Sequence, residues 1–167
     1  MTRLITSIYV VLAVCLSPAA WTHEVHASSV TITVEGSRLE VLQTTPKATA
    51  MTIAGKVRGH GGPVRELDEV LATIAERWSV RTGDAACAVS RMAYRELDHA
   101  SEMQMRLLFE CGALGPPERL GAAWLPAAPE DHFIILELTI AGKTETVVFS
   151  GQELVLDLTT PQGSSGS

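Results

Sequence analysis

Two histidines near the start of the chain, His23 and His26, are the residues best suited to chemistry, because they lie three residues apart. Zn²⁺ takes three or four ligands from imidazole, thiolate or carboxylate groups in a near-tetrahedral arrangement. A turn in this segment would bring both imidazoles to one metal ion. The alternative is a solvated segment whose histidines bind nothing.

A second candidate group surrounds His99, which lies among three acidic residues: Glu96, Asp98 and Glu102. One imidazole and three carboxylates form a compact set of zinc ligands. The alternative is the solvated, charged tip of a hairpin. If a metal site exists, we expect it to join the amino-terminal histidines to His99.

Two further histidines carry weaker signals. His132 follows Glu130 and Asp131 at the start of a strand-like segment, which makes it a candidate zinc ligand, although a simple surface role fits the same pattern. His60 lies among glycines and is expected to be a plain loop residue.

The cysteines predict a disulfide. Cys15 falls in an expected signal peptide, which leaves Cys87 and Cys111 as an even pair in an oxidising compartment. Closing a loop of 24 residues would contribute about 3 kcal/mol by the chain-entropy relation. Two thiolate metal ligands are the alternative, but neither cysteine has the CxxC or CxxH neighbour typical of zinc sites.

The first twenty residues, Met1–Ala20, are typical of a cleaved export signal. Arg3 supplies the positive start, Leu4–Leu16 is an apolar run, and Ser17–Ala20 offers small residues for a peptidase. The run is too short for a comfortable membrane span, and no later segment is apolar for long enough. We therefore expect a periplasmic protein without a membrane span in its mature chain.

Two other ways of processing remain open. Cleavage after Ala27 would remove both amino-terminal histidines. A lipoprotein would use Cys15, but Val14 is larger than the residue that such processing prefers before the cysteine.

Composition limits the class of partner and of activity. The formal net charge is −6, and it becomes −7 when Arg3 is removed with the signal peptide. An acidic chain is a poor candidate for binding nucleic acid or anionic membranes. The sequence has no G-x-S-x-G or H-E-x-x-H motif, and Gly59–Gly62 lacks the Lys-Ser/Thr pair that follows in a P-loop. We therefore expect no enzyme.

The hydrophobic pattern predicts a single β-rich domain over residues 21–160, followed by a flexible tail over residues 161–167. Its expected class is α+β: an antiparallel sheet or sandwich with one packed amphipathic helix. The expected helix covers Val64–Trp78, and Ala48–Val57 is a third strand or an irregular crossing. Glu118–Leu125 is expected to be helical or rich in turns. The expected strands are Val30–Val34, a segment from Leu39 to Pro46, Ala86–Tyr94, Met103–Cys111, Phe133–Ile140, Thr144–Phe149 and Leu154–Leu158.

Several of these segments together resemble the zinc-regulated periplasmic proteins of the ZrgA type. The shared features are the H-x-x-H opening, the hairpin VTITVEGSRLEV, the segments DAACAVSRMAY and MRLLFEC, and the closing FIILELTIAGKTETVVFSGQELVLDL. The resemblance implies zinc as the bound ion and a zinc ABC transporter component as a partner. Members of that family carry a long His-rich tract between the cysteine strands. Here the tract shrinks to Arg95–Met103, with His99 as its single histidine.

Two alternatives stay open. The run Thr22–Val25 is similar to the amino-terminal domain of HupE-type nickel or cobalt permeases, which continue into membrane helices. The other alternative is a metal-free, disulfide-stapled β domain that docks a partner through an edge strand or an apolar patch.

Overall fold

A computed structural model of the chain describes residues 27–59, 66–97, 101–150 and 154–159. The expected signal peptide, the expected tail and five residues discussed above lie outside these ranges: His23, His26, His60, Asp98 and His99.

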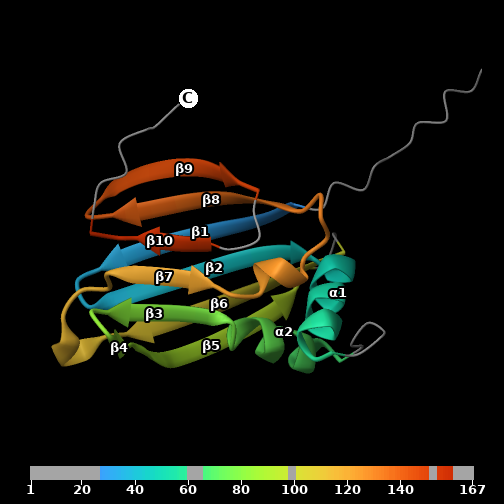
Figure 1. Ribbon diagram of the computed structural model, residues 1–167, viewed down its shortest axis with the longest axis horizontal. Coiled ribbons are helices and arrows are strands. Elements are labelled where there is room, and N and C mark those ends of the chain that lie inside the picture. The colour runs from blue at the N-terminus through green and yellow to red at the C-terminus, as the bar shows by residue number, and fades with distance from the viewer. Residues whose placement is uncertain (1–26, 60–65, 98–100, 151–153, 160–167) are drawn as a thin grey trace, which may run out of the picture.

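Within the described ranges the chain forms two β-sheets and two α-helices, as expected for a β-rich α+β fold (Figure 1). The larger sheet has the strand order β5-β6-β2-β1-β8-β9, and the smaller one has the order β10-β7-β3-β4. The larger sheet comprises β1 (Ala27–Glu35), β2 (Arg38–Pro46), β5 (Ala88–Glu96), β6 (Glu102–Glu110), β8 (Phe133–Ile140) and β9 (Lys143–Phe149). The smaller sheet comprises β3 (Trp78–Thr82), β4 (Ala85–Ala86), β7 (Arg119–Ala122) and β10 (Leu154–Asp157).

The first hairpin follows directly from the sequence. Val30 and Ile32 are buried while Thr31 and Thr33 lie on the opposite, half-buried face, which is the period of a strand with one face in the core. The chain turns at Gly36, whose φ of 58° is a conformation that glycine adopts at no steric cost. The predicted strand-turn-strand is confirmed.

One strand pairing differs from the expected antiparallel arrangement. β1 and β8 pair in parallel, from Ala27 opposite Phe133 to Val34 opposite Ile140. Every other pairing is antiparallel among the residues that the structure describes. β1 thus lies between its hairpin partner and a strand that comes about a hundred residues later.

The expectation of a third strand or an irregular crossing over Ala48–Val57 is wrong, because this segment is the helix α1 (Lys47–Val57). It begins directly after Pro46, whose fixed φ ends β2. Thr49, Ala50, Ile53 and Ala54 are buried, which is the spacing of one helical face. The described residues therefore form two α-helices where one was expected.

Of the expected helix over Val64–Trp78, α2 covers Leu67–Ala75, and Val64 and Arg65 lie outside the described residues. Val70, Leu71 and Ile74 form its buried face as predicted, and Asp68 lies in its first turn. Trp78 belongs instead to β3, where it pairs with Ala122. The side chain is buried in either arrangement, so the helical spacing was misleading at that position.

The segment Glu118–Leu125 contains a strand that the sequence did not indicate. β7 pairs with both β3 and β10 and so lies inside the smaller sheet. Leu120 lies opposite Val80 on one side and Leu156 on the other, and all three are buried. The expectation of a helical or turn-rich segment was therefore wrong for Arg119–Ala122. Two short 3₁₀ turns flank the strand, at Gly112–Leu114 and Leu125–Ala127.

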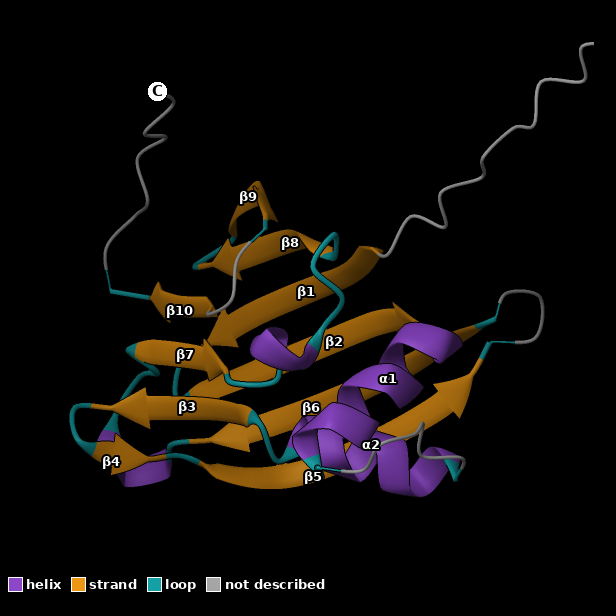
Figure 2. Cartoon of the chain, turned by 45° about the vertical axis from the view of Figure 1, so that its right-hand side comes forward, coloured by secondary structure: helices purple, strands orange, loops and turns teal. Residues whose placement is uncertain are grey.

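The smaller sheet and both helices cover the same face of the larger sheet (Figures 1 and 2). One core fills the space between them, and its largest fully buried side chains come from both sheets and both helices. These include Trp124, Phe109, Ile32, Leu39, Ile53 and Ile74. No described helix is long and apolar enough to cross a membrane.

Candidate functional site

The hairpin between β5 and β6 carries the described part of the expected metal site. Glu96 is the last residue of β5, and its Oε1 lies 2.5 Å from Nζ of Lys47 at the start of α1. The backbone N–H of Leu97 donates to the carbonyl of Glu102 at 3.1 Å, which closes the hairpin. The carboxylate of Glu96 is thus neutralised by an ammonium group, and a metal ion would have to compete for it.

Glu102, another expected ligand, lies in the same hairpin, as the first residue of β6, but His132 does not join them. His132 is only 5% exposed, so its expected surface role is wrong. Its ring lies against Trp124 in an edge-on arrangement with 6.0 Å between ring centroids. It precedes β8, which is separated from β5 by three strands of the larger sheet, so His132 and Glu96 do not meet. Among the described residues no three His, Cys, Asp or Glu side chains gather into a metal-binding group.

The predicted disulfide is confirmed. Cys87 and Cys111 are bonded, with an S–S distance of 2.02 Å and a Cα–Cα distance of 4.4 Å. The bond ties the residue before β5 to the residue after β6, so it staples two neighbouring strands. The thiolate-ligand alternative is thereby ruled out for the oxidised protein.

The most distinctive feature of this surface is β5 itself. All nine of its residues are exposed, in contrast to β6 beside it, where every second side chain is buried. β5 forms one edge of the larger sheet, and β6 is the one strand that pairs with it among the described residues. A bulge at Ser90 separates its beginning from a regular stretch that runs from Arg91 to Glu96.

The backbone of this regular stretch offers hydrogen-bonding groups to a further strand. In an antiparallel pair, residues alternate between pointing both backbone groups at the partner strand and pointing both away from it. Leu97 bonds to Glu102, so the same pairing recurs at Arg95 and Ala93. The N–H and C=O groups of Met92 and Tyr94 therefore point away from β6, to the free edge of the sheet.

The inner face of β5, on the side of the helices, is apolar but incompletely covered. Met92 is 44% exposed and Tyr94 is 39% exposed, and Val89 is exposed as well. The hydroxyl of Tyr94 donates a hydrogen bond to Asp68 of α2, and this bond is the main reason why the pKa of Tyr94 is raised above its ordinary value. The inner side of this edge therefore carries the negative charge of the Asp68 carboxylate.

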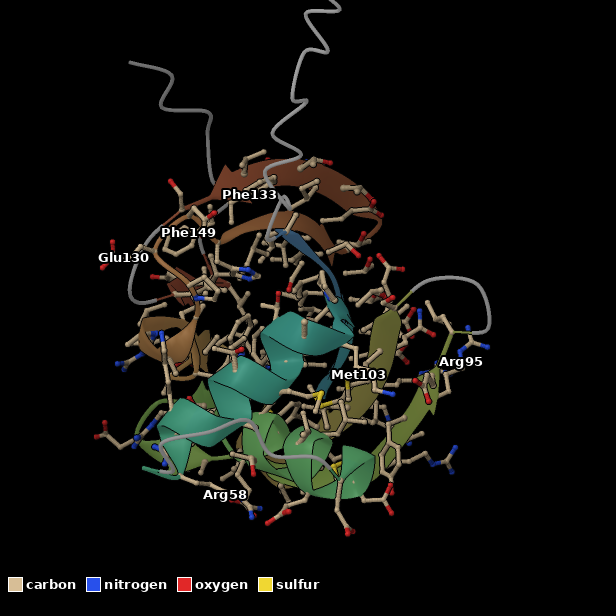
Figure 3. All side chains as sticks on the ribbon, turned by 90° about the vertical axis from the view of Figure 1, so that its right-hand side faces the viewer. Arg58, Arg95, Met103, Glu130, Phe133 and Phe149 are labelled. Atoms are coloured by element: carbon tan, nitrogen blue, oxygen red, sulfur yellow. A yellow bond between two sulfur atoms is a disulfide. The ribbon has the colours of Figure 1, made fainter. Side chains whose placement is uncertain are left out.

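The outer face of β5 carries Arg91, Ala93 and Arg95. The short side chain of Ala93 leaves room for a hollow of about 440 Å³, which Arg95 also lines. Leu42, Gln104 and Arg106 line it from β2 and β6. In Figure 3 the side chain of Arg95 points away from the molecule, whereas Met103 points in beneath α1.

The charges in this hollow are unevenly paired. Glu40 accepts a hydrogen bond of 2.6 Å from Arg106, which neutralises that guanidinium and raises its pKa. Arg95 donates through Nε to the neutral amide oxygen of Gln104 at 2.9 Å. None of the ion pairs formed by the described side chains involves Arg91 or Arg95. Two guanidinium charges on the outer face of β5 are therefore available to an external anion.

This edge was not predicted as a site from the sequence, although the signal was present. The run Arg91-Met92-Ala93-Tyr94-Arg95 alternates basic or small residues with apolar ones, which in a strand places them on opposite faces. The chain matches no protein-family model, and the search of curated proteins found no match either.

Proposed function

We propose that this protein is a protein-interaction domain that takes an extended segment of a partner onto β5 as an additional strand. The observation that carries the proposal is the free edge of β5, whose nine residues are all exposed and whose backbone groups at Met92 and Tyr94 point outward. Main-chain hydrogen bonds provide the affinity in this mode of recognition, and alternate side chains provide the specificity.

Both ends of β5 are fastened, which supports the proposal. The disulfide holds its beginning, and the Lys47–Glu96 ion pair joins its end to α1. The backbone N–H of Cys87 also donates to the carbonyl of Val80 in β3 at 2.9 Å. A strand held in this way loses little conformational freedom when a partner binds, and this lowers the entropic cost of association.

The test is an unbiased selection from a displayed library of peptides, followed by measurement of affinity for designed variants. Met92→Pro removes an N–H group that points to the free edge and leaves the β6 ladder intact. Met92→Thr is the matched control, because it changes the side chain and keeps the N–H group. We expect selected peptides to bind the parent and Met92→Thr, to lose affinity for Met92→Pro, and to slow hydrogen exchange at Met92 and Tyr94. Peptides that bind Met92→Pro as tightly as the parent would contradict the proposal.

Zinc binding, export to the periplasm and service to a transporter remain predictions. Four of the seven expected ligands, His23, His26, Asp98 and His99, lie outside the described residues. Titration of the oxidised protein with zinc tests this hypothesis independently of the β5 edge.

A further inference from the structure

We infer that the segment docked by β5 alternates acidic and apolar residues, with two carboxylates four residues apart facing Arg91 and Arg95. This inference rests on the proposed function, because only a strand paired with β5 would hold its side chains in that register.

The backbone geometry brings the outer side chains of the two strands close together. Met92 and Tyr94 point their N–H and C=O groups at the incoming strand, so they would form its hydrogen-bonded pairs. Arg91, Ala93 and Arg95 would then form the non-hydrogen-bonded pairs, in which opposing Cα atoms approach to about 4.5 Å. At that separation a Glu or Asp directly opposite an arginine reaches its guanidinium group.

The outer face of β5 sets the spacing of the acidic residues. Arg91 and Arg95 lie on the same face and are about 13 Å apart along an extended strand. The hollow beside Ala93 accommodates the side chain between the two carboxylates. Of the charged groups that line this hollow and its smaller neighbour, three are arginines and one is Glu40, although the chain as a whole has a net charge of −6. The basic character is therefore local to this surface.

The inner face sets the alternation. Exposed Met92 and Tyr94 offer apolar contacts to every second residue of the partner. An acidic residue placed on this side would instead meet Asp68, which already accepts the hydrogen bond from Tyr94. A shift of the partner by one residue exchanges the two faces of its strand. An alternating segment therefore binds only in registers that place its acidic residues on the outer face, beside the arginines.

A second copy of this chain is a poorer occupant of the same edge. Pairing of β5 with itself would bring the arginines of the two copies into proximity on one face of the joined sheet. Like charges on neighbouring strands destabilise a sheet, and charged edge strands oppose edge-to-edge association for this reason. An acidic partner relieves the repulsion that a copy would create.

A synthetic peptide designed with the inferred alternation of acidic and apolar residues tests the inference. The probe is the acetylated amide of Thr-Val-Glu-Val-Thr-Val-Glu-Val-Thr, and its control carries Gln in place of both Glu residues. We expect the Gln peptide to bind about tenfold more weakly, as two exposed ion pairs would predict. Arg91→Gln/Arg95→Gln should weaken the Glu peptide by about the same factor and leave the Gln peptide unchanged. Arg119→Gln, an exposed change on β7, is the matched control and should alter neither affinity.

Methylation of the peptide backbone separates strand pairing from simple charge attraction. N-methyl groups on the two central valines block the amides that face β5, whereas N-methyl groups on the first and last threonines of the peptide do not. We expect binding to be lost in the first case and kept in the second.

Each remaining outcome overturns a definite part of the inference. If both peptides bind equally and both fail with Met92→Pro, the acidic preference is wrong while the proposed function stands. If binding of the Glu peptide depends on the two arginines but tolerates N-methylation of the central valines, binding is by charge alone. Both the inferred register and the proposed docking of a strand are then wrong. If neither peptide binds at millimolar concentration, the inference is overturned, and the library selection decides the proposed function separately.

Discussion

The indole Nε1 of Trp78 donates a hydrogen bond of 3.0 Å to Oε1 of Gln43, and this contact joins the smaller sheet to the larger one. The amide of Gln43 in turn donates to Oγ1 of Thr45 at 2.9 Å, and the Thr45 hydroxyl lies 2.8 Å from that of Ser28. All four side chains are buried. A connected chain of buried hydrogen bonds specifies how the two sheets are aligned, because any sliding would leave polar groups unpaired.

Replacing the central residue of this chain should be costly. We expect Gln43→Leu to lower the free energy of unfolding by about 1–3 kcal/mol, because it leaves the buried Trp78 indole without its hydrogen-bond acceptor and removes one of the two partners of the Thr45 hydroxyl. Urea unfolding measures the loss, and Ser29→Ala, an exposed change on β1, is the control. A change no larger than that of the control would show that the two sheets do not depend on this contact.

Reduction of the disulfide should destabilise the protein and loosen the beginning of β5. The loop between Cys87 and Cys111 spans 24 residues, which corresponds to about 3 kcal/mol in the chain-entropy relation. We expect a reductant to lower the urea midpoint of the parent and to leave that of Cys87→Ala/Cys111→Ala unchanged. An unaltered midpoint for the parent would contradict the expectation.

The hydrogen bond between Tyr94 and Asp68 predicts a late tyrosine titration. The protonated hydroxyl is the donor, so the raised pKa of Tyr94 means that this bond stabilises the fold at neutral pH. The stabilisation is fully present below the ordinary tyrosine pKa of about 10 and is lost as the pH rises through the raised value.

The absorbance of the phenolate reports this titration directly. The chain has two tyrosines, and the other, Tyr9, belongs to the expected signal peptide, so Tyr94 is the single tyrosine of the expected mature chain. We expect Asp68→Asn to return its pKa toward the ordinary value. The exposed change Glu76→Gln near the other end of α2 serves as the control. Identical titrations of the parent and Asp68→Asn would show that the bond does not form in solution.

The zinc hypothesis predicts saturable binding near one equivalent by calorimetry on the oxidised chain that begins at Trp21 and carries no affinity tag. Affinity should fall below about pH 6.5, where unperturbed imidazoles become protonated. The triple variant His23→Ala/His26→Ala/His99→Ala should lose the binding. Zinc affinity equal to that of the parent in this variant, or no binding by the parent at high micromolar zinc, would remove the metal role.

The hydrophobic pattern of the sequence predicted those elements that have one clearly apolar face and one clearly polar face. The alternation around Val30 and Ile32 predicted β1, and the spacing of Val70, Leu71 and Ile74 predicted the buried face of α2. α1 was missed because Thr49, Thr52 and Ile53 are β-branched and favour strands, while the alanines of its buried face are small and give little hydrophobic periodicity. β7 was missed because Gly115, Pro116 and Pro117 interrupt the chain directly before this segment and suggest turns, whereas its pairing on both sides comes from strands distant in the sequence.

The candidate site illustrates a different limit. The residue types of β5 alternate visibly, and the disulfide pairing was predicted from the cysteine count. The sequence does not show that β5 is an edge strand, because that depends on the order in which the strands assemble. His132 shows the same limit in reverse: its acidic neighbours fitted a zinc ligand or a surface residue, and packing against Trp124 places it in the core.

The parallel pairing of β1 with β8 has a consequence for how the chain reaches its native state. Until Phe133–Ile140 is available, one side of β1 has no partner, and its backbone groups remain open to other chains. Contacts over such a long sequence separation form slowly, because the intervening chain must first be ordered. A nascent or truncated chain that ends before β8 should therefore aggregate, and a chaperone that shields β1 during synthesis or transport would raise the yield of folded protein.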